Sequence, residues 1–145
     1  MSDRSTRVVI VEDDASLRRA MQRLLQVCGL STDAYESAEC YVDAGVAIDD
    51  YDCFVLDLHL PGMSGVEMMD RCAIPGAKTV CITAYDDDAS RLAARQRSVA
   101  AFLPKPFQGD ALLVCVSDVI GYRLSGASGH ERSGAWSPGS TTGQV

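Results

Sequence analysis

Several side chains that could take part in chemistry stand at the ends of apolar runs. Glu12 and Asp13 follow RVVIV, Asp57 ends CFVLD, Thr83 ends TVCIT, and Lys105 follows AFL after one proline. Carboxylates that are packed together repel one another, so ionising all of them requires a compensating positive charge. Mg²⁺ offsets such repulsion, since it binds carboxylate oxygens, waters and phosphate oxygens. Carboxylates, a hydroxyl and a lysine together predict a phosphoryl-transfer site.

In such a site Asp57 is the candidate nucleophile, because a carboxylate can attack phosphorus and form an aspartyl phosphate. Phosphoryl transfer depends mainly on positioning and on neutralising charge. Mg²⁺ and Lys105 would neutralise the phosphoryl oxygens, and Thr83 would donate a hydrogen bond to them. The small Ala84 leaves room for the group to enter. We therefore interpret Asp57 as the phosphate acceptor.

Short strands are expected to position these residues. The first run is continuous and β-branched, as is typical of a strand buried on both faces. The second is more polar and is a candidate edge strand. The predicted strands are Arg7–Val11, Leu30–Tyr35, Cys53–Asp57, Thr79–Thr83 and Ala101–Leu103.

Amphipathic segments between these runs predict helices. They are Ala15–Cys28, Ser37–Gly45, Gly65–Cys72, Asp88–Ser98 and Asp110–Tyr122. Asp14 is expected to cap the first of them. The fourth has only Leu92 as a large apolar anchor, so we expect it to pack weakly. Alternating strands and helices predict a parallel sheet covered on both faces, with ligands bound at the carboxyl ends of the strands.

Four segments, VVIVEDD, FVLDLHLPGMSG, ITAYD and AFLPKPF, occur in this order. Together they resemble the signature blocks of the receiver domains of bacterial two-component response regulators, and the resemblance covers about residues 7–122. It implies an α/β, flavodoxin-like (βα)5 fold, a doubly wound five-stranded parallel sheet. The implied strand order is 2-1-3-4-5, for which the chemotaxis receiver is the standard example.

The resemblance also implies a role for each matching residue. The implied Mg²⁺ ligands, for which Mn²⁺ would substitute, are Asp13, Asp57, Glu12 through water, and the backbone carbonyl of His59. A histidine side-chain ligand is disfavoured. The remaining implied roles belong to the switch hydroxyl of Thr83, the phosphate-binding Lys105, the switch aromatic Phe102, and Ala84 and Tyr85 beside the phosphate entrance. The Lys105–Pro106 bond resembles a cis peptide of the family, and simple packing is the alternative for Phe102.

The implied function is phosphorelay signal transduction. A histidine kinase or a histidine phosphotransfer protein would phosphorylate Asp57. The protein-interaction face formed by Asp88–Ser98, Ala101–Leu103 and Asp110–Tyr122 would then switch, with Phe102 drawn inward. That face is also a candidate homodimer interface. We expect no enzyme activity beyond Mg²⁺-dependent self-phosphorylation and autodephosphorylation.

Several alternatives stay open at this point. The chain could be a stand-alone regulator or the receiver fragment of a longer DNA-binding transcriptional regulator. A degenerate receiver that binds partners without phosphorylation is less favoured, because the site residues are intact. A phosphatase of the haloacid dehalogenase type is disfavoured, because Asp13-Asp14-Ala15 lacks the D-x-D pattern.

The composition limits the partners and the location. The chain has 145 residues and a net charge of −7, which disfavours nucleic-acid binding by this segment. No apolar run approaches membrane-spanning length and no signal peptide is recognised, so we expect a cytoplasmic protein without membrane contact.

Two further features complete the sequence prediction. The cysteines are interpreted as small buried hydrophobic residues rather than disulfides or zinc ligands; they are Cys28, Cys40, Cys53, Cys72, Cys81 and Cys115. Residues 1–123 are predicted to form the receiver domain, and residues 124–145 a flexible Gly/Ser-rich tail in which Trp136 is solvated.

Overall fold

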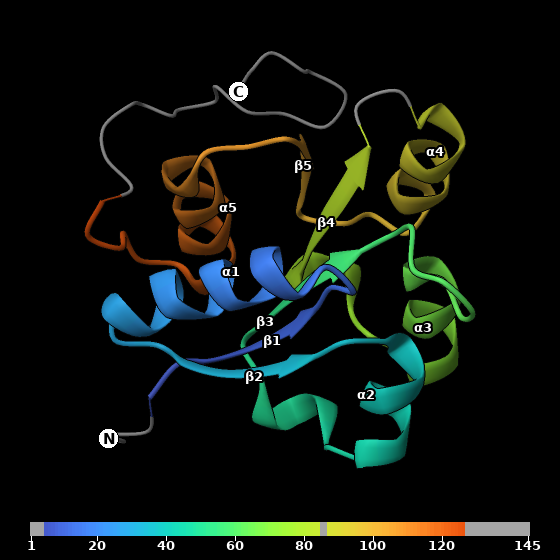
Figure 1. Cartoon of the computed structure of the whole chain (residues 1–145), viewed down its shortest axis with the longest axis horizontal. Helices are drawn as coiled ribbons and strands as arrows, with labels where there is room; N and C mark the ends of the chain where they lie inside the picture. The colour runs from blue at the N-terminus through green and yellow to red at the C-terminus, as the bar shows by residue number, and fades with distance from the viewer. Residues whose placement is uncertain (1–4, 85–86, 127–145) are drawn as a thin grey trace.

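Five parallel strands form the centre of the computed structural model, which describes residues 5–84 and 87–126 (Figure 1). The strands are β1 (Arg7–Val11), β2 (Ser31–Tyr35), β3 (Cys53–Asp57), β4 (Thr79–Ala84) and β5 (Ala101–Lys105). Their order is β2-β1-β3-β4-β5, and every neighbouring pair is parallel. The predicted flavodoxin-like topology and the edge position of β2 are therefore confirmed.

Helices cover both faces of the sheet. The α-helices are α1 (Ala15–Val27), α2 (Ala38–Ala44), α3 (Gly65–Cys72), α4 (Asp88–Gln96) and α5 (Gly109–Ile120), with 3₁₀ turns at η1 (Ile48–Asp50) and η2 (Gly76–Lys78). Figure 1 shows α1 and α5 on one face of the sheet and α2, α3 and α4 on the other. This arrangement follows from the short crossovers between successive parallel strands.

Strand β5 extends two residues further than predicted. Thr83 pairs with Pro104, and Ala84 pairs with Lys105. A proline is tolerated here because β5 is an edge strand, and only one side of its backbone needs ladder hydrogen bonds. Lys105 therefore belongs to the sheet itself rather than to the loop after it.

The side chains of the inner strands alternate between two cores. Val8 and Ile10 of β1 pack with α1 and α5, whereas Val9 and Val11 pack on the opposite face. All four are fully buried. The alternation is the consequence of the two-residue period of a strand, and it explains why these strands are apolar at every position.

Helix α4 packs differently from our prediction. Leu92, the expected anchor, is 52% exposed, and Arg91 and Ala94 take the buried positions instead. Arg97, just after the helix, binds Asp70 of α3 through two hydrogen bonds of 2.8 and 2.7 Å. The prediction of Leu92 as the anchor was wrong, since the helix turns that residue toward solvent.

The packed structure continues past residue 123. Leu124 is only 3% exposed and belongs to the core on the α1 and α5 side. Its backbone N–H donates to Ser117 Oγ at 3.0 Å. The boundary drawn after residue 123 therefore excluded a core residue, while Trp136 and the rest of 127–145 lie outside the described residues.

The cysteines follow the prediction only in part. All six are free. Cys53, Cys81 and Cys115 are buried, Cys28 and Cys72 are half-buried, and Cys40 is exposed. Among the described residues, no helix is long and apolar enough to cross a membrane.

Candidate functional site

The predicted acidic residues meet at the carboxyl edge of the sheet. Glu12 and Asp13 follow β1, and Asp57 ends the neighbouring β3, where Val11 pairs with Leu56. One carboxylate oxygen from each of the three residues lies within 4.8 Å of those of the other two. Glu12 and Asp57 are buried, and Asp13 is exposed at the mouth of the cluster.

Lys105 reaches this cluster from the end of β5. Its Nζ lies 3.0 Å from Asp57 Oδ2 and 3.2 Å from Glu12 Oε1. Burial lowers the pKa of Lys105, but the hydrogen bond to Asp57 and the charges of both carboxylates outweigh it, and the net shift is upward. Lys105 is therefore held as a cation against Asp57.

Glu12 is a buried carboxylate with a raised pKa. Burial raises its pKa to about 7; the hydrogen bond from Asp14 N–H and the contacts with Lys105 oppose this, and the charge of Asp57 adds to it. Glu12 Oε1 is buried, and its ion-pair partner is the Lys105 ammonium that Asp57 also contacts. Three carboxylates thus face one ammonium group. Oxygen donors with surplus negative charge fit a hard divalent cation such as Mg²⁺.

Both oxygens of Asp57 are already oriented. Oδ1 accepts a hydrogen bond from the His59 N–H at 2.8 Å, and Oδ2 accepts one from Lys105. Gly65, the first residue of α3, packs directly on the main chain here, because a Cβ on it would lie 2.5 Å from the Asp57 carbonyl oxygen. Our sequence reasoning did not identify Gly65 as a site residue. A glycine beside a helix-capping serine is the signal that could have found it.

The three consecutive acids have separate positions. Glu12 Oε2 accepts from the Asp14 N–H at 3.0 Å. Asp14 Oδ1 accepts from the N–H groups of Ser16 and Leu17 at 2.9 and 3.2 Å, so its expected role as the cap of α1 is confirmed. Only Glu12 and Asp13 of this run join the cluster.

Thr83 lies in β4, next to β3, and Phe102 lies in the edge strand β5. The Thr83 hydroxyl is buried and donates to the Ala84 carbonyl at 3.2 Å. Phe102 is 1% exposed, with the Arg95 guanidinium 5.9 Å from its ring centre. We expected the Phe102 side chain to move inward from an exposed position. In this structure it is already buried. Ala84 ends β4, and Tyr85 lies outside the described residues.

The His59 side chain points to a different partner. Its Nδ1 lies 3.1 Å from Asp87 Oδ2, and the side chain is 72% exposed. Asp87 in turn caps α4 by accepting from the Ser90 N–H. The imidazole is not part of the carboxylate cluster, and the Lys105–Pro106 peptide bond is cis, as expected.

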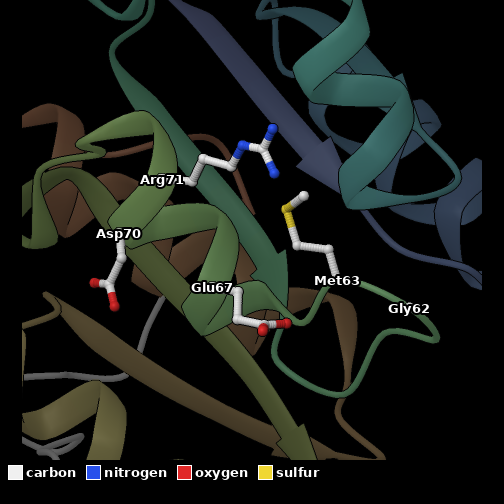
Figure 2. Close-up of a pocket in the computed structure, with 5 residues that line it drawn as sticks. All are labelled: Gly62, Met63, Glu67, Asp70 and Arg71. Carbon is white, nitrogen blue, oxygen red and sulfur yellow. The ribbon is translucent and has the colours of Figure 1, made fainter.

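A pocket of about 600 Å³ lies over α3 (Figure 2). Its lining residues are Gly62, Met63, Glu67, Asp70 and Arg71. Both carboxylates already have partners, since Glu67 accepts from the Ser64 N–H in a capping box and Asp70 binds Arg97. None of the predicted site residues lines it, so this pocket adds nothing to the carboxylate chemistry.

Comparison with known proteins agrees with this geometry. The family model of the response regulator receiver domain matches residues 8–117. The transcriptional regulatory protein FixJ of Azorhizobium caulinodans is 32% identical over 116 residues, which are 79% of this chain and 54% of that protein. The DNA-binding transcriptional regulator NtrC of Klebsiella pneumoniae is 30% identical, over 78% of this chain and 24% of that protein.

A solved structure shows the same similarity. The crystal structure of a response regulator receiver protein from Burkholderia phymatum is 36% identical, with a TM-score of 0.69. The match covers 82% of this chain and 98% of that one. By contrast, the chain covers only 54% of FixJ and 24% of NtrC, which are longer proteins. The convergent carboxylates, the lysine, the topology and these matches lead to one conclusion: the chain belongs to the response regulator receiver domain family of two-component systems.

Proposed function

We propose that Asp57 accepts a phosphoryl group from a phosphohistidine and that this phosphorylation is the signal the domain transmits. One observation carries the proposal: the buried Asp57 carboxylate shares the Lys105 ammonium with Glu12 and lies in one cluster with Glu12 and Asp13. A purely structural aspartate would need only one partner. Here the lysine and the surplus negative charge form an arrangement that suits both an incoming phosphoryl group and a cation.

In the proposed step an Asp57 carboxylate oxygen bonds to phosphorus as the P–N bond of phosphohistidine breaks. The leaving imidazole takes up a proton, and the product is an acyl phosphate on Asp57. The His59 N–H and Lys105 orient the carboxylate before attack. The Lys105 ammonium would then donate a hydrogen bond to a phosphoryl oxygen, which carries the added negative charge. Positioning and charge neutralisation are the main requirements of this chemistry.

Glu12, Asp13 and Asp57 are the side chains that would hold Mg²⁺, with the His59 carbonyl as a further ligand and Mn²⁺ as a substitute. A bound Mg²⁺ supplies neutralisation of the phosphoryl charge. The gathering of three carboxylates, two of them buried, around the one Lys105 ammonium supports this assignment. The chain's own part is to keep these acidic oxygens within 4.8 Å of one another.

The proposed donor is a histidine kinase or a histidine phosphotransfer protein. A hollow of about 410 Å³ adjoins Lys105 and is lined by Asp14, Ser16, Leu17, Lys105, Pro106 and Phe107. We propose that the donor side chain approaches Lys105 through this hollow. We propose that the domain acts as a phosphoacceptor in the cytoplasm and not as an enzyme acting on other substrates.

We propose that Thr83 transmits the phosphorylation of Asp57 to the rest of the domain. Its hydroxyl now donates to the Ala84 carbonyl and would turn toward a phosphoryl group on Asp57. That rotation would pull on the end of β4 and on the start of α4, where His59 contacts Asp87. Phe102 would respond from its buried position, and the α4–β5–α5 face would present the changed surface to a partner or to a second copy.

A second candidate concerns the output. The curated relatives FixJ and NtrC are named as transcriptional regulators and are longer than the matched segment. The receiver half of a DNA-binding regulator is therefore an alternative to a stand-alone regulator. Reading the gene beyond codon 145 for a DNA-binding domain distinguishes the two.

The test of Asp57 is incubation of the purified chain with acetyl phosphate and Mg²⁺, followed by intact-mass measurement. Wild type should gain one phosphoryl group, Asp57→Asn should gain none, and chelation by EDTA should prevent the gain. Asp33→Asn is the matched control, because Asp33 lies in β2 away from the cluster and should leave phosphorylation unchanged. Equal uptake by Asp57→Asn would refute the acceptor assignment.

A further inference from the structure

We infer that Arg18 is a positioning residue for cation binding, because its guanidinium holds the main chain that joins Glu12 to Asp13. This inference rests on the proposed function, in which these two acids bind Mg²⁺. Arg18 lies in the first half of α1 and is half-buried. Its Nη1 donates to the Glu12 carbonyl oxygen at 2.8 Å.

The hydrogen bond from Arg18 is made to the peptide group that joins two of the proposed Mg²⁺ ligands. The Glu12 carbonyl belongs to the peptide unit between the buried Glu12 and the exposed Asp13. On the preceding peptide, the Glu12 N–H donates to the Tyr35 carbonyl at 3.1 Å, which continues the β1–β2 ladder. A backbone carbonyl beyond the strand end needs a partner of its own. Arg18 supplies that partner from a helix that begins only a few residues later.

The same short turn is held at three further points. Glu12 Oε2 accepts from the Asp14 N–H, and Asp14 caps α1 through the N–H groups of Ser16 and Leu17. These bonds fix the start of α1 relative to the turn, but none of them holds the peptide unit that carries Asp13. Arg18 is the described residue whose side chain does so. Loss of this bond should let the Asp13 carboxylate swing away from Glu12 and Asp57.

Charge and positioning predict opposite effects on Mg²⁺ affinity. Removing a positive charge close to the cluster would by itself strengthen cation binding. Removing a contact that orients a metal ligand weakens binding, typically about 10- to 100-fold. Weaker Mg²⁺ binding after loss of Arg18 therefore separates the positioning role from a simple charge effect.

Arg19 provides a matched control. It is the next residue of α1, it is exposed, and its side chain makes no hydrogen bond or ion pair within the described part of the chain. Arg19→Gln removes the same charge from the same helix without touching the Glu12 carbonyl. The ratio of the dissociation constants of Arg18→Gln and Arg19→Gln therefore isolates the hydrogen bond.

The experiment is calorimetric titration of the full chain with MgCl₂, combined with urea unfolding in EDTA to show that each variant is folded. We expect Arg18→Gln to raise the Mg²⁺ dissociation constant about 10-fold, and Arg19→Gln to leave it unchanged or slightly lower. Arg18→Lys, which keeps the charge but not the planar guanidinium, should fall between wild type and Arg18→Gln.

Equal dissociation constants for Arg18→Gln and Arg19→Gln would overturn the inference while leaving the proposed function intact. No Mg²⁺ binding by wild type would instead overturn the metal assignment on which the inference depends. If Arg18→Gln fails to fold, Arg18→Lys carries the test, and an affinity equal to that of wild type would then count against the positioning role.

Discussion

The charged residues at the two ends of β1 are arranged differently. At the start of the strand, Arg7 forms hydrogen bonds with the side chains of Asp33, Tyr51 and Asp52. Beyond the end of the strand, Glu12 and Asp13 join Asp57 in a cluster with a single lysine. Only four residues separate Arg7 from Glu12, so one strand carries both arrangements.

The polar groups at the start of β1 are joined by hydrogen bonds, with Arg7 as the cation beside the carboxylates of Asp33 and Asp52. Tyr51 Oη donates to Asp33 Oδ2 at 2.6 Å, and Arg7 Nη2 donates to Tyr51 Oη at 3.1 Å. The Arg7 guanidinium also lies 4.5 Å from the centre of the Tyr51 ring, and the Arg7 N–H donates to Asp52. These groups satisfy one another, so this edge of the sheet needs no ligand and its role is structural.

The cluster beyond the end of β1 is unbalanced. Its three carboxylates lie within 4.8 Å of one another around one lysine, and those of Glu12 and Asp57 are buried. Such an arrangement costs stability in the isolated protein, and a cation recovers it. The difference teaches that the functional edge can be recognised by buried carboxylates packed against one another rather than by the number of charged residues.

The largest expected effect is the loss of Mg²⁺ binding when a carboxylate is removed from the cluster beyond the end of β1. Asp13→Asn should weaken Mg²⁺ binding by more than about 100-fold, because it removes a proposed direct ligand, and even second-layer changes cost about 10- to 100-fold. Asp33→Asn, which changes the hydrogen-bonded network at the start of β1, should leave Mg²⁺ binding unchanged. Titration calorimetry of both variants measures this, and a similar loss in both would erase the distinction between the two ends.

The next largest effect is the pH dependence of the metal-free protein. Burial raises the pKa of Glu12 from 4.5 to about 7, so the folded protein holds a proton that the unfolded chain releases between these values. Stability in EDTA should therefore fall as pH rises from about 4.5 to about 7, by on the order of 2 kcal/mol.

Urea unfolding at several pH values, compared between wild type and Glu12→Gln, measures this contribution. Glu12→Gln should flatten the decline, since glutamine does not titrate. An unchanged decline in the variant would show that another group is responsible. Saturating Mg²⁺ should also flatten the decline in wild type, because the cation replaces the proton.

The smallest effect concerns two buried tyrosines. Tyr51→Phe removes the hydroxyl that joins Arg7 and Asp33, and should cost about 1 kcal/mol of unfolding free energy. Tyr41→Phe removes a buried hydroxyl without a hydrogen-bond partner, and should be neutral or slightly stabilising. Neither should change Mg²⁺ affinity. Chemical denaturation compares the pair, and equal losses would argue against the network at the start of β1.

Much of the site could be predicted from the sequence because its members stand at strand ends. In a parallel sheet the carboxyl ends of neighbouring strands meet at one edge, so Glu12, Asp13, Asp57 and Lys105 had to converge. The apolar runs and the helical periods likewise predicted the order of the elements. These features depend on local patterns that the chain carries residue by residue.

The sequence alone did not determine contacts that depend on how the elements are set against each other. The rotation of α4 decides that Arg91 is buried and Leu92 exposed, although leucine is the more apolar residue. The path after α5 decides that Leu124 enters the core.

The same limit holds at the active edge. The sequence determined which acids and which lysine stand at the strand ends, and therefore the chemistry available there. The tertiary structure alone decided that Gly65 packs on the Asp57 main chain and that Arg18 reaches the Glu12 carbonyl. The physical reason is that residue type and spacing determine local conformation, whereas such contacts are set by the distances and rotations between packed elements.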